Sequence, residues 1–123
     1  MQRIVGMPDD QAAAAASARD AVFAPGAVVL LTLGSPREKF WGILLQISAA
    51  GISLRGLDLN SFEDFVHQVR AGEPATPGAV FFPMHRVERM EADEHSGGIP
   101  SLKERFQEKT GRPLAHLFGR YGE

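Results

Sequence analysis

The 123-residue chain contains no cysteine, which excludes a disulfide framework, a thiol nucleophile and a thiolate metal site. It has no apolar run long enough to span a bilayer, and the acidic pair Asp9 and Asp10 argues against a secretory leader. A net charge of −2 lacks the cation excess of a broad phosphate-binding surface, although it permits a local basic patch. These absences predict a cytoplasmic protein that is not a membrane protein.

No pair of nucleophile and general base can be identified, so the chain is not expected to be an enzyme, and no cofactor and no metal are expected. Two groups of side chains could hold a cation: Asp58 with Glu63 and His67, and Asp93 with Glu94 and His95. Neither group has a fixed ligand spacing. A solvated helix face and a solvated acidic linker are therefore the simpler interpretations.

The chain is organised around a predicted β-hairpin, with strands over 40–47 and 52–55 joined by a turn over 48–51. Gly42 lies inside the first of these strands, where a glycine marks a sharp bend or a close backbone approach. Trp41 has the opposite phase to its neighbour Phe40, which places Trp41 on the surface of the predicted barrel.

Three further strands surround this hairpin. Residues 27–33 form an apolar first strand that ends at a Gly-Ser-Pro turn. Near the end of the barrel the apolar period breaks at Pro83, which predicts a strand over 79–82, a single 3₁₀ turn over 84–86, and a last strand over 87–91.

Helices are predicted on both sides of the strands. Residues 9–22 are rich in alanine, and a second helix over 62–70 has one apolar face and a capping box at Ser61 and Asp64. A third helix begins at Ser101 with a second capping box and ends at Gly111. The tail then offers three apolar docking residues for its own barrel or for a neighbouring subunit, namely Leu114, Leu117 and Phe118.

The predicted fold is mainly β with flanking helices, a bent five-stranded barrel of the SH3-like kind. A helical arm over 1–26 precedes the barrel over 27–92, which carries a helical insertion at 61–70 before its fourth strand. A linker and a C-terminal helical tail occupy 93–123.

This order of elements resembles the Sm-like family. Gly42 is similar in position to the bend glycine of that family, and His85-Arg86-Val87 is similar to the His-x-Ile turn of bacterial Sm-like RNA chaperones. The first Sm motif is matched in its hydrophobic spacing at Phe40, Leu44, Ile47, Ile52 and Leu54. Its acidic residue and asparagine are missing, since Ser48-Ala49-Ala50-Gly51 stands there, and Met84 occupies the position of the chaperones' lysine.

The resemblance implies a cyclic homo-oligomer that binds single-stranded RNA. The residues expected at RNA are His85, Arg86, Arg55, Arg89 and Phe81, and those expected at the subunit interface are Phe81, Phe82 and Met90. For the turn, the alternative is that His85 caps it and that Arg86 pairs with Glu88 or with an acidic residue of a neighbouring subunit. The alternative function is a protein-interaction or regulatory scaffold that uses the barrel and the added helices, with the C-terminal tail as a candidate surface for a protein partner.

Overall fold

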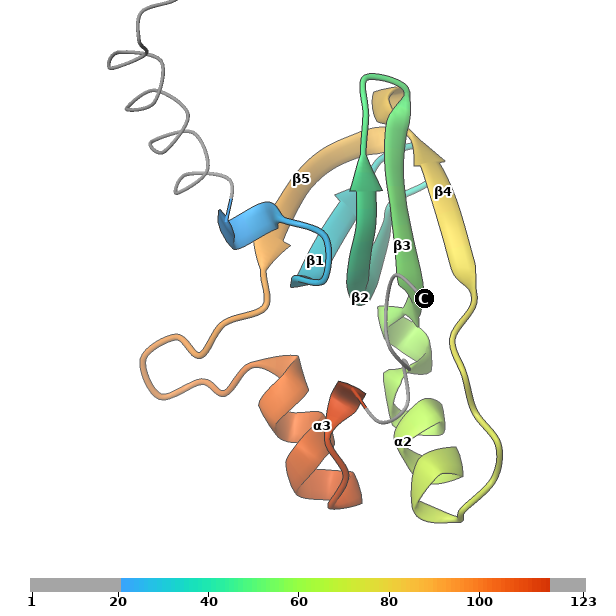
Figure 1. Ribbon diagram of the computed structural model, residues 1–123, viewed down its shortest axis with the longest axis vertical. Helices are drawn as coiled ribbons and strands as arrows, with labels where there is room; N and C mark the ends of the chain where they lie inside the picture. The colour runs from blue at the N-terminus through green and yellow to red at the C-terminus, as the bar shows by residue number, and fades with distance from the viewer. Residues whose placement is uncertain (1–20, 116–123) are drawn as a thin grey trace, which may run out of the picture.

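The computed structural model describes residues 21–115, and within that range the fold is mainly β, as predicted (Figure 1). A 3₁₀ turn, η1 (Ala21–Phe23), leads into one five-stranded antiparallel sheet with two α-helices. The helix predicted over 9–22 lies almost entirely outside the described residues. The remaining elements are β1 (Val28–Leu33), β2 (Glu38–Ile47), β3 (Gly51–Asp58), η2 (Leu59–Ser61), α2 (Phe62–Arg70), β4 (Ala79–Pro83), η3 (Met84–Arg86), β5 (Val87–Ala92) and α3 (Leu102–Thr110).

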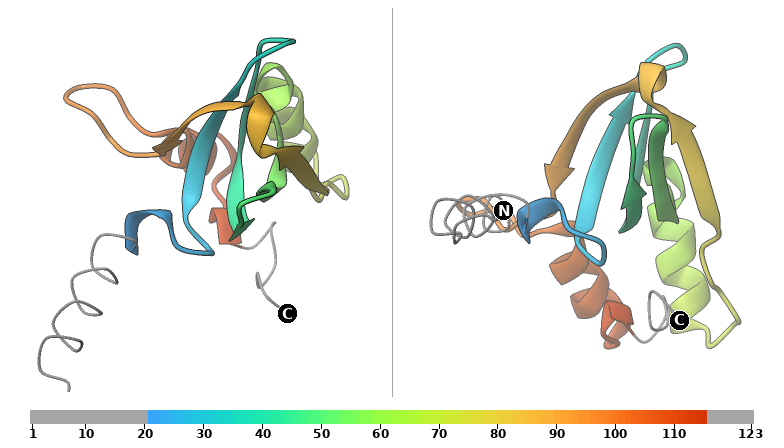
Figure 2. Two further views of the ribbon diagram at one scale, coloured as in Figure 1. Left: turned by 90° about the horizontal axis from the view of Figure 1, so that it is seen from above. Right: turned by 45° about the horizontal axis from the view of Figure 1, so that its top comes forward.

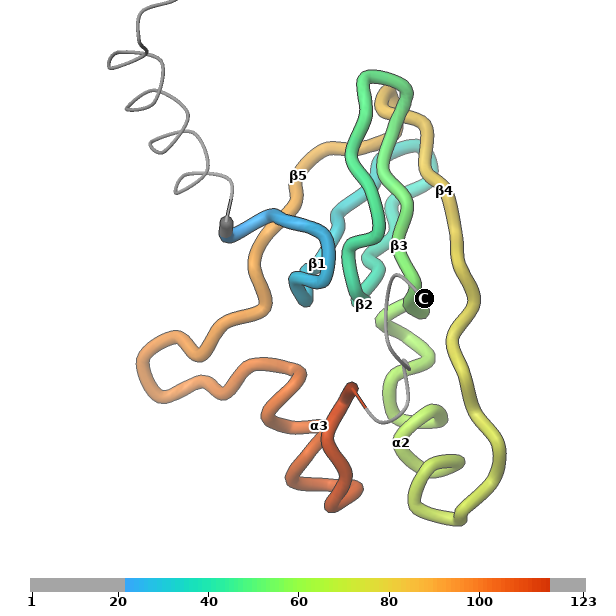
Figure 3. The backbone as a smooth tube through the Cα atoms, in the orientation of Figure 1, coloured from blue at the N-terminus to red at the C-terminus, as the bar shows by residue number. Residues whose placement is uncertain are grey.

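The strand order is β4-β3-β2-β1-β5, so β4 and β5 form the two edges of the sheet. Only the three residues of η3 separate these edges along the chain. In the tube view the two strands diverge from that turn, one to each side of the central hairpin (Figure 3). The sheet is therefore strongly bent, because its first and last strands in the order meet at one corner.

The two faces of the sheet bury separate apolar clusters, because side chains alternate along each strand. The inner cluster fills the concave side of the bend and contains Val29, Leu31, Leu33, Leu44, Ile52, Leu54 and Phe82. The outer cluster lies between the sheet and the helices and contains Trp41, Ile43, Phe62, Phe65, Val66, Val69, Phe106 and Leu114. Figure 2 shows both helices on one side of the strands.

The prediction that Trp41 lies on the surface is wrong. Its side chain is 0% exposed, and its ring lies edge-on to Phe62 with centroids 5.2 Å apart. Trp41 does face away from the inner cluster, as its alternation with Phe40 predicts. That face of the sheet is not exposed to solvent, because α2 and α3 cover it.

Gly42 lies at the close strand approach that the sequence predicts. Its partner across β2 and β3 is a second glycine, Gly56. A Cβ on Gly42 would lie 2.7 Å from the Gly56 Cα and would overlap the carbonyl oxygen of Arg55. A Cβ on Gly56 would meet the backbone of Trp41 and Gly42 in the same way. The absence of both side chains therefore lets the two strands approach closely at this pair.

The capping predictions have different outcomes for the two helices. Ser101 caps α3 as predicted: its Oγ accepts from Glu104 N at 3.0 Å, while Glu104 Oε1 accepts from Ser101 N at 2.7 Å. Ser61, in contrast, makes no side-chain cap to α2, so the capping box predicted there is wrong. Asp58 caps the preceding η2 turn instead, accepting from Asn60 N at 2.7 Å.

The tail packs on the sheet of its own chain. Asp93, just after β5, accepts hydrogen bonds from Trp41 Nε1 at 3.0 Å and from the first two backbone N–H groups of α3, those of Leu102 and Lys103, each at 2.8 Å. Leu114 is 2% exposed in the outer cluster, so it docks the tail on its own chain, which is the first of the two alternatives predicted for it. Leu117 and Phe118 lie outside the described residues.

No helix in the described range is long and apolar enough to cross a membrane.

Candidate functional site

The outer edge of β4 carries backbone groups that no other strand of the described sheet uses. Hydrogen-bonded pairs alternate along an antiparallel ladder. The donations from Gly56 N to the Gly78 oxygen, and from Met84 N to the Ala50 oxygen, fix the phase of the β3–β4 ladder. In that phase Val80 and Phe82 bond to β3, while the N–H and C=O groups of Ala79 and Phe81 point outward. We call these outward groups the β4 edge.

The side chain of Phe81 stands on the outer face of the sheet beside that edge and is 52% exposed. Its cross-strand partner is Ser53, and its ring lies over Gly51, where a Cβ would come within 2.6 Å of the ring. A hollow of about 510 Å³ adjoins the ring, lined by Leu45, Gln46, Ser53, Ala79, Val80 and Phe81. An exposed aromatic ring beside a hollow is suited to contact with another molecule.

Arg55 lies on the same outer face, two residues beyond Ser53 on β3. Its Nη1 donates to the Pro77 oxygen at 3.1 Å. Among the described residues, no carboxylate lies within ion-pair distance of this guanidinium. The structure therefore places two of the five RNA candidates, Arg55 and Phe81, as diagonal neighbours on one surface.

The η3 turn holds the other predicted pair, but its arginine has a structural role. Arg86 donates from Nε to the Gly34 oxygen at 3.0 Å and from Nη2 to the Pro36 oxygen at 2.7 Å, and Nη2 also pairs with Glu38 at 2.9 Å. The alternative pairing with Glu88 is wrong, since Glu38 is the partner. Arg86 thus joins η3 to the β1–β2 loop, whereas His85 is exposed on the same turn.

The remaining candidates lie on β5 and β4. Arg89 is exposed and pairs with Glu91 at 3.6 Å. Phe82 is only 5% exposed, and its ring lies edge-on to Phe40 with centroids 4.7 Å apart, so the interior of the chain already buries this interface candidate. Met90 packs its side chain against the inner cluster.

The β5 strand also has an outward edge. The donation from Asp93 N to the Val28 oxygen fixes the phase of the β1–β5 ladder, so Arg89 and Glu91 bond to β1. Consequently the backbone groups of Met90 and Ala92 point outward. We call these groups the β5 edge.

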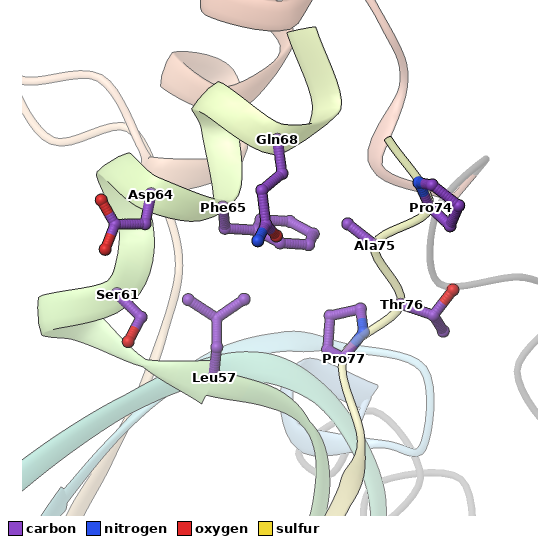
Figure 4. Close-up of a pocket in the computed structure, with 9 residues that line it drawn as sticks. All are labelled: Leu57, Ser61, Asp64, Phe65, Gln68, Pro74, Ala75, Thr76 and Pro77. Atoms are coloured by element: carbon purple, nitrogen blue, oxygen red, sulfur yellow. The ribbon is translucent and has the colours of Figure 1, made fainter. Parts of the chain in front are cut away.

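A second hollow, of about 480 Å³, separates α2 from the segment that leads into β4 (Figure 4). Leu57 and Phe65 line one side, and Ala75 and Pro77 line the other. The carboxamide of Gln68 points into the space in front of the Phe65 ring. We call this space the α2 hollow. Sequence reasoning missed it, because its walls come from separate segments of the chain.

The acidic linker does not form a cation site in the described part of the chain, where no three ligand side chains converge. Asp93 caps α3, and His95 Nδ1 lies 3.0 Å from Glu104 Oε1 while His95 Nε2 lies 2.8 Å from the Gly97 oxygen. The Glu104 carboxylate, followed by the Gly97 carbonyl, raises the pKa of His95. The backbone N–H of Ser101 and then His95 lower the pKa of Glu104.

Comparison with protein-family models, with curated proteins and with solved structures gives no match to this chain. Its function is therefore inferred from its own residues and surfaces.

Proposed function

We propose that this chain is a non-catalytic Sm-like module that assembles into a closed homo-oligomer, with the β4 edge of one copy pairing with the β5 edge of the next. The strand order β4-β3-β2-β1-β5, the single turn between the two edge strands and the glycine bend in β2 support the Sm-like assignment. A barrel bent in this way directs its two edge strands, β4 and β5, to different sides of the subunit. Each subunit of a ring can then pair with two neighbours.

The observation that carries the proposal is the pair of complementary edges. The β4 edge offers the N–H and C=O groups of Ala79 and Phe81, and the β5 edge offers those of Met90 and Ala92. Unpaired strand edges associate readily unless they are short, charged or covered. The β4 edge carries the exposed ring of Phe81 and no charged side chain, so it is an available pairing surface.

The test is the mass of the particle in solution, measured by light scattering, for the wild type and for Ala79→Pro. Proline at this position removes an outward N–H and leaves the bonds to β3 in place. We expect a defined oligomer for the wild type and a monomer for Ala79→Pro, with similar melting curves. Ala79→Val is the matched control, because it keeps the N–H group and should keep the oligomer.

A wild-type monomer at high micromolar concentration would refute the assembly. So would an Ala79→Pro variant that retains the full oligomer mass.

Single-stranded RNA binding is the second candidate function, favoured by the placement of the exposed Phe81 ring beside the partly exposed Arg55 on the outer face of the sheet. An aromatic ring can stack on a base while a guanidinium contacts phosphate. Titration with RNA homopolymers at two salt concentrations tests it: binding should weaken as salt rises and should weaken further in Phe81→Leu. Arg112→Ala, which removes an exposed cation elsewhere, is the control. No binding of any homopolymer at low salt would eliminate this candidate.

A further inference from the structure

The α2 hollow is an open groove with mixed apolar and polar walls, and it is large enough for one large apolar side chain with its flanking backbone. Its volume is about 480 Å³, and apolar surface from Leu57, Phe65, Ala75 and Pro77 lines it on two sides. Phe65 lies on α2, Pro77 lies in the segment before β4, and both side chains are buried, so one residue on each wall is held in place by packing. Hollows that combine apolar walls with a few polar groups are typical ligand sites.

Polar groups around the hollow have no partner among the described residues. The carboxamide of Gln68 and the hydroxyl of Ser61 line the space and make no hydrogen bond there. The backbone N–H groups of Ala75 and Thr76 are also unpaired, although this segment runs directly into β4. An extended segment with free backbone groups beside a hollow is the arrangement that captures an extended peptide.

The charge at one end of the hollow is negative. Asp64 lines that end, and no cation in the described part of the chain pairs with it. The adjacent Glu63 differs, because it pairs with Arg105 at 3.4 Å and with Lys109 at 3.8 Å. Asp64 is therefore the helix carboxylate that remains available to a bound molecule.

We propose that the α2 hollow binds an extended segment of a partner protein that carries a large apolar residue close to a lysine or arginine. The apolar side chain enters between Phe65 and Ala75, the peptide backbone bonds to Gln68 and to the N–H groups of Ala75 and Thr76, and the basic side chain reaches Asp64. This site lies on α2 and the 73–78 segment, so it does not depend on pairing at the β4 edge.

The test is selection from a phage-displayed library of random dodecapeptides on the immobilised full chain. We expect enriched sequences to share a Leu, Ile or Phe within a few positions of Lys or Arg. A synthetic copy of the most enriched peptide should bind Asp64→Asn several-fold more weakly than it binds the wild type. It should bind Ala75→Trp, in which the indole fills the hollow, at least tenfold more weakly. Glu73→Gln removes the same charge from outside the hollow and should bind like the wild type.

Gln68→Ala changes the opposite wall of the hollow. It keeps the test valid if the tryptophan at position 75 perturbs the 73–78 segment. Binding that survives both Ala75→Trp and Gln68→Ala would overturn the proposal, as would enriched peptides without a basic residue or the absence of any enrichment. The same peptide should bind the Ala79→Pro variant with unchanged affinity. That result would show that peptide binding at the α2 hollow does not depend on assembly through the β4 edge. Each of the two proposals can therefore be refuted without the other.

Discussion

Gly42 and Gly56 face each other at the point where β2 and β3 approach most closely. Because each would place a Cβ against the backbone of the opposite strand, neither position tolerates a side chain without moving that strand. The close approach of β2 and β3 therefore depends on two missing side chains.

The first prediction follows from this contact. Gly42→Val should lower the free energy of unfolding by about 3 kcal/mol, because the added side chain forces the two strands apart. Thermal and denaturant melts measure the change. Gly78→Val is the control, since a Cβ at Gly78 meets no atom within 4 Å, and it should cost far less. Equal stability of the wild type and Gly42→Val would contradict the close approach.

Trp41 connects the sheet to both helices, so its truncation should be the more damaging of two aromatic changes. Trp41→Ala should cost about 4 kcal/mol, because it leaves a cavity in the outer cluster. Phe81→Ala removes an exposed ring and should cost less than about 1 kcal/mol. Urea melts measure the free energy of unfolding of both variants. A similar decrease in the two variants would mean that the outer cluster contributes little to stability.

Arg86→Ala and His85→Ala should differ in their effect on the free energy of unfolding. Arg86→Ala removes the donor to two loop carbonyls and the partner of Glu38, and should cost about 2 kcal/mol of stability. His85→Ala changes an exposed side chain and should leave the melt unaltered. An RNA experiment that changes both residues would therefore confuse lost folding with lost binding, whereas His85→Ala alone avoids that confusion. An unaltered melt of Arg86→Ala would show that the turn is held by other contacts.

At the scale of elements, α3 is joined to the sheet at its N-terminus as well as by its apolar face. The Asp93 carboxylate occupies the positive end of the helix and at the same time accepts from the Trp41 indole. His95 adds a contact to Glu104 within the same turn. One carboxylate, that of Asp93, thus connects the start of α3 with the end of β5 and the middle of β2.

The His95–Glu104 contact predicts a pH dependence. The raised pKa of His95 means that its contribution is complete below its ordinary value of 6.5 and is lost as pH rises through the folded-state pKa. The lowered pKa of Glu104 means that its contribution is present above 4.5 and is lost as pH falls through its folded-state pKa. Hydrogen exchange of the first turn of α3 should therefore be slower in the wild type than in His95→Gln near pH 5.5, and equal near pH 8. A difference that persists unchanged at pH 8 would exclude this pair as its source.

At the scale of the whole molecule, the sequence predicts the strands and the ends of α3 well, because those depend on local signals. Pro83 placed the η3 turn, and Ser101 with Gly111 placed the caps of α3. The burial of Trp41 was not predictable in the same way. It depends on α3, which is about sixty residues away in sequence and whose position is fixed by Asp93.

The candidate surfaces depend even more on long-range pairing. Phe81 was identified from sequence because two adjacent phenylalanines cannot both enter one core, and the structure shows Phe82 inside and Phe81 outside. Gly56 could have been found, since a second glycine fourteen residues beyond Gly42, on the other strand of a hairpin, suggests a facing pair. The α2 hollow has no such signal, because its walls come from three separate segments.

The hydrogen bonds of Arg86 hold the turn between the two edge strands against the β1–β2 loop. If copies join edge to edge, the divergence of β4 and β5 from this turn, together with the twist between the paired edges, sets the rotation from each subunit to the next and so the number of subunits. A guanidinium that holds this turn then contributes to the circumference of any ring that the copies form.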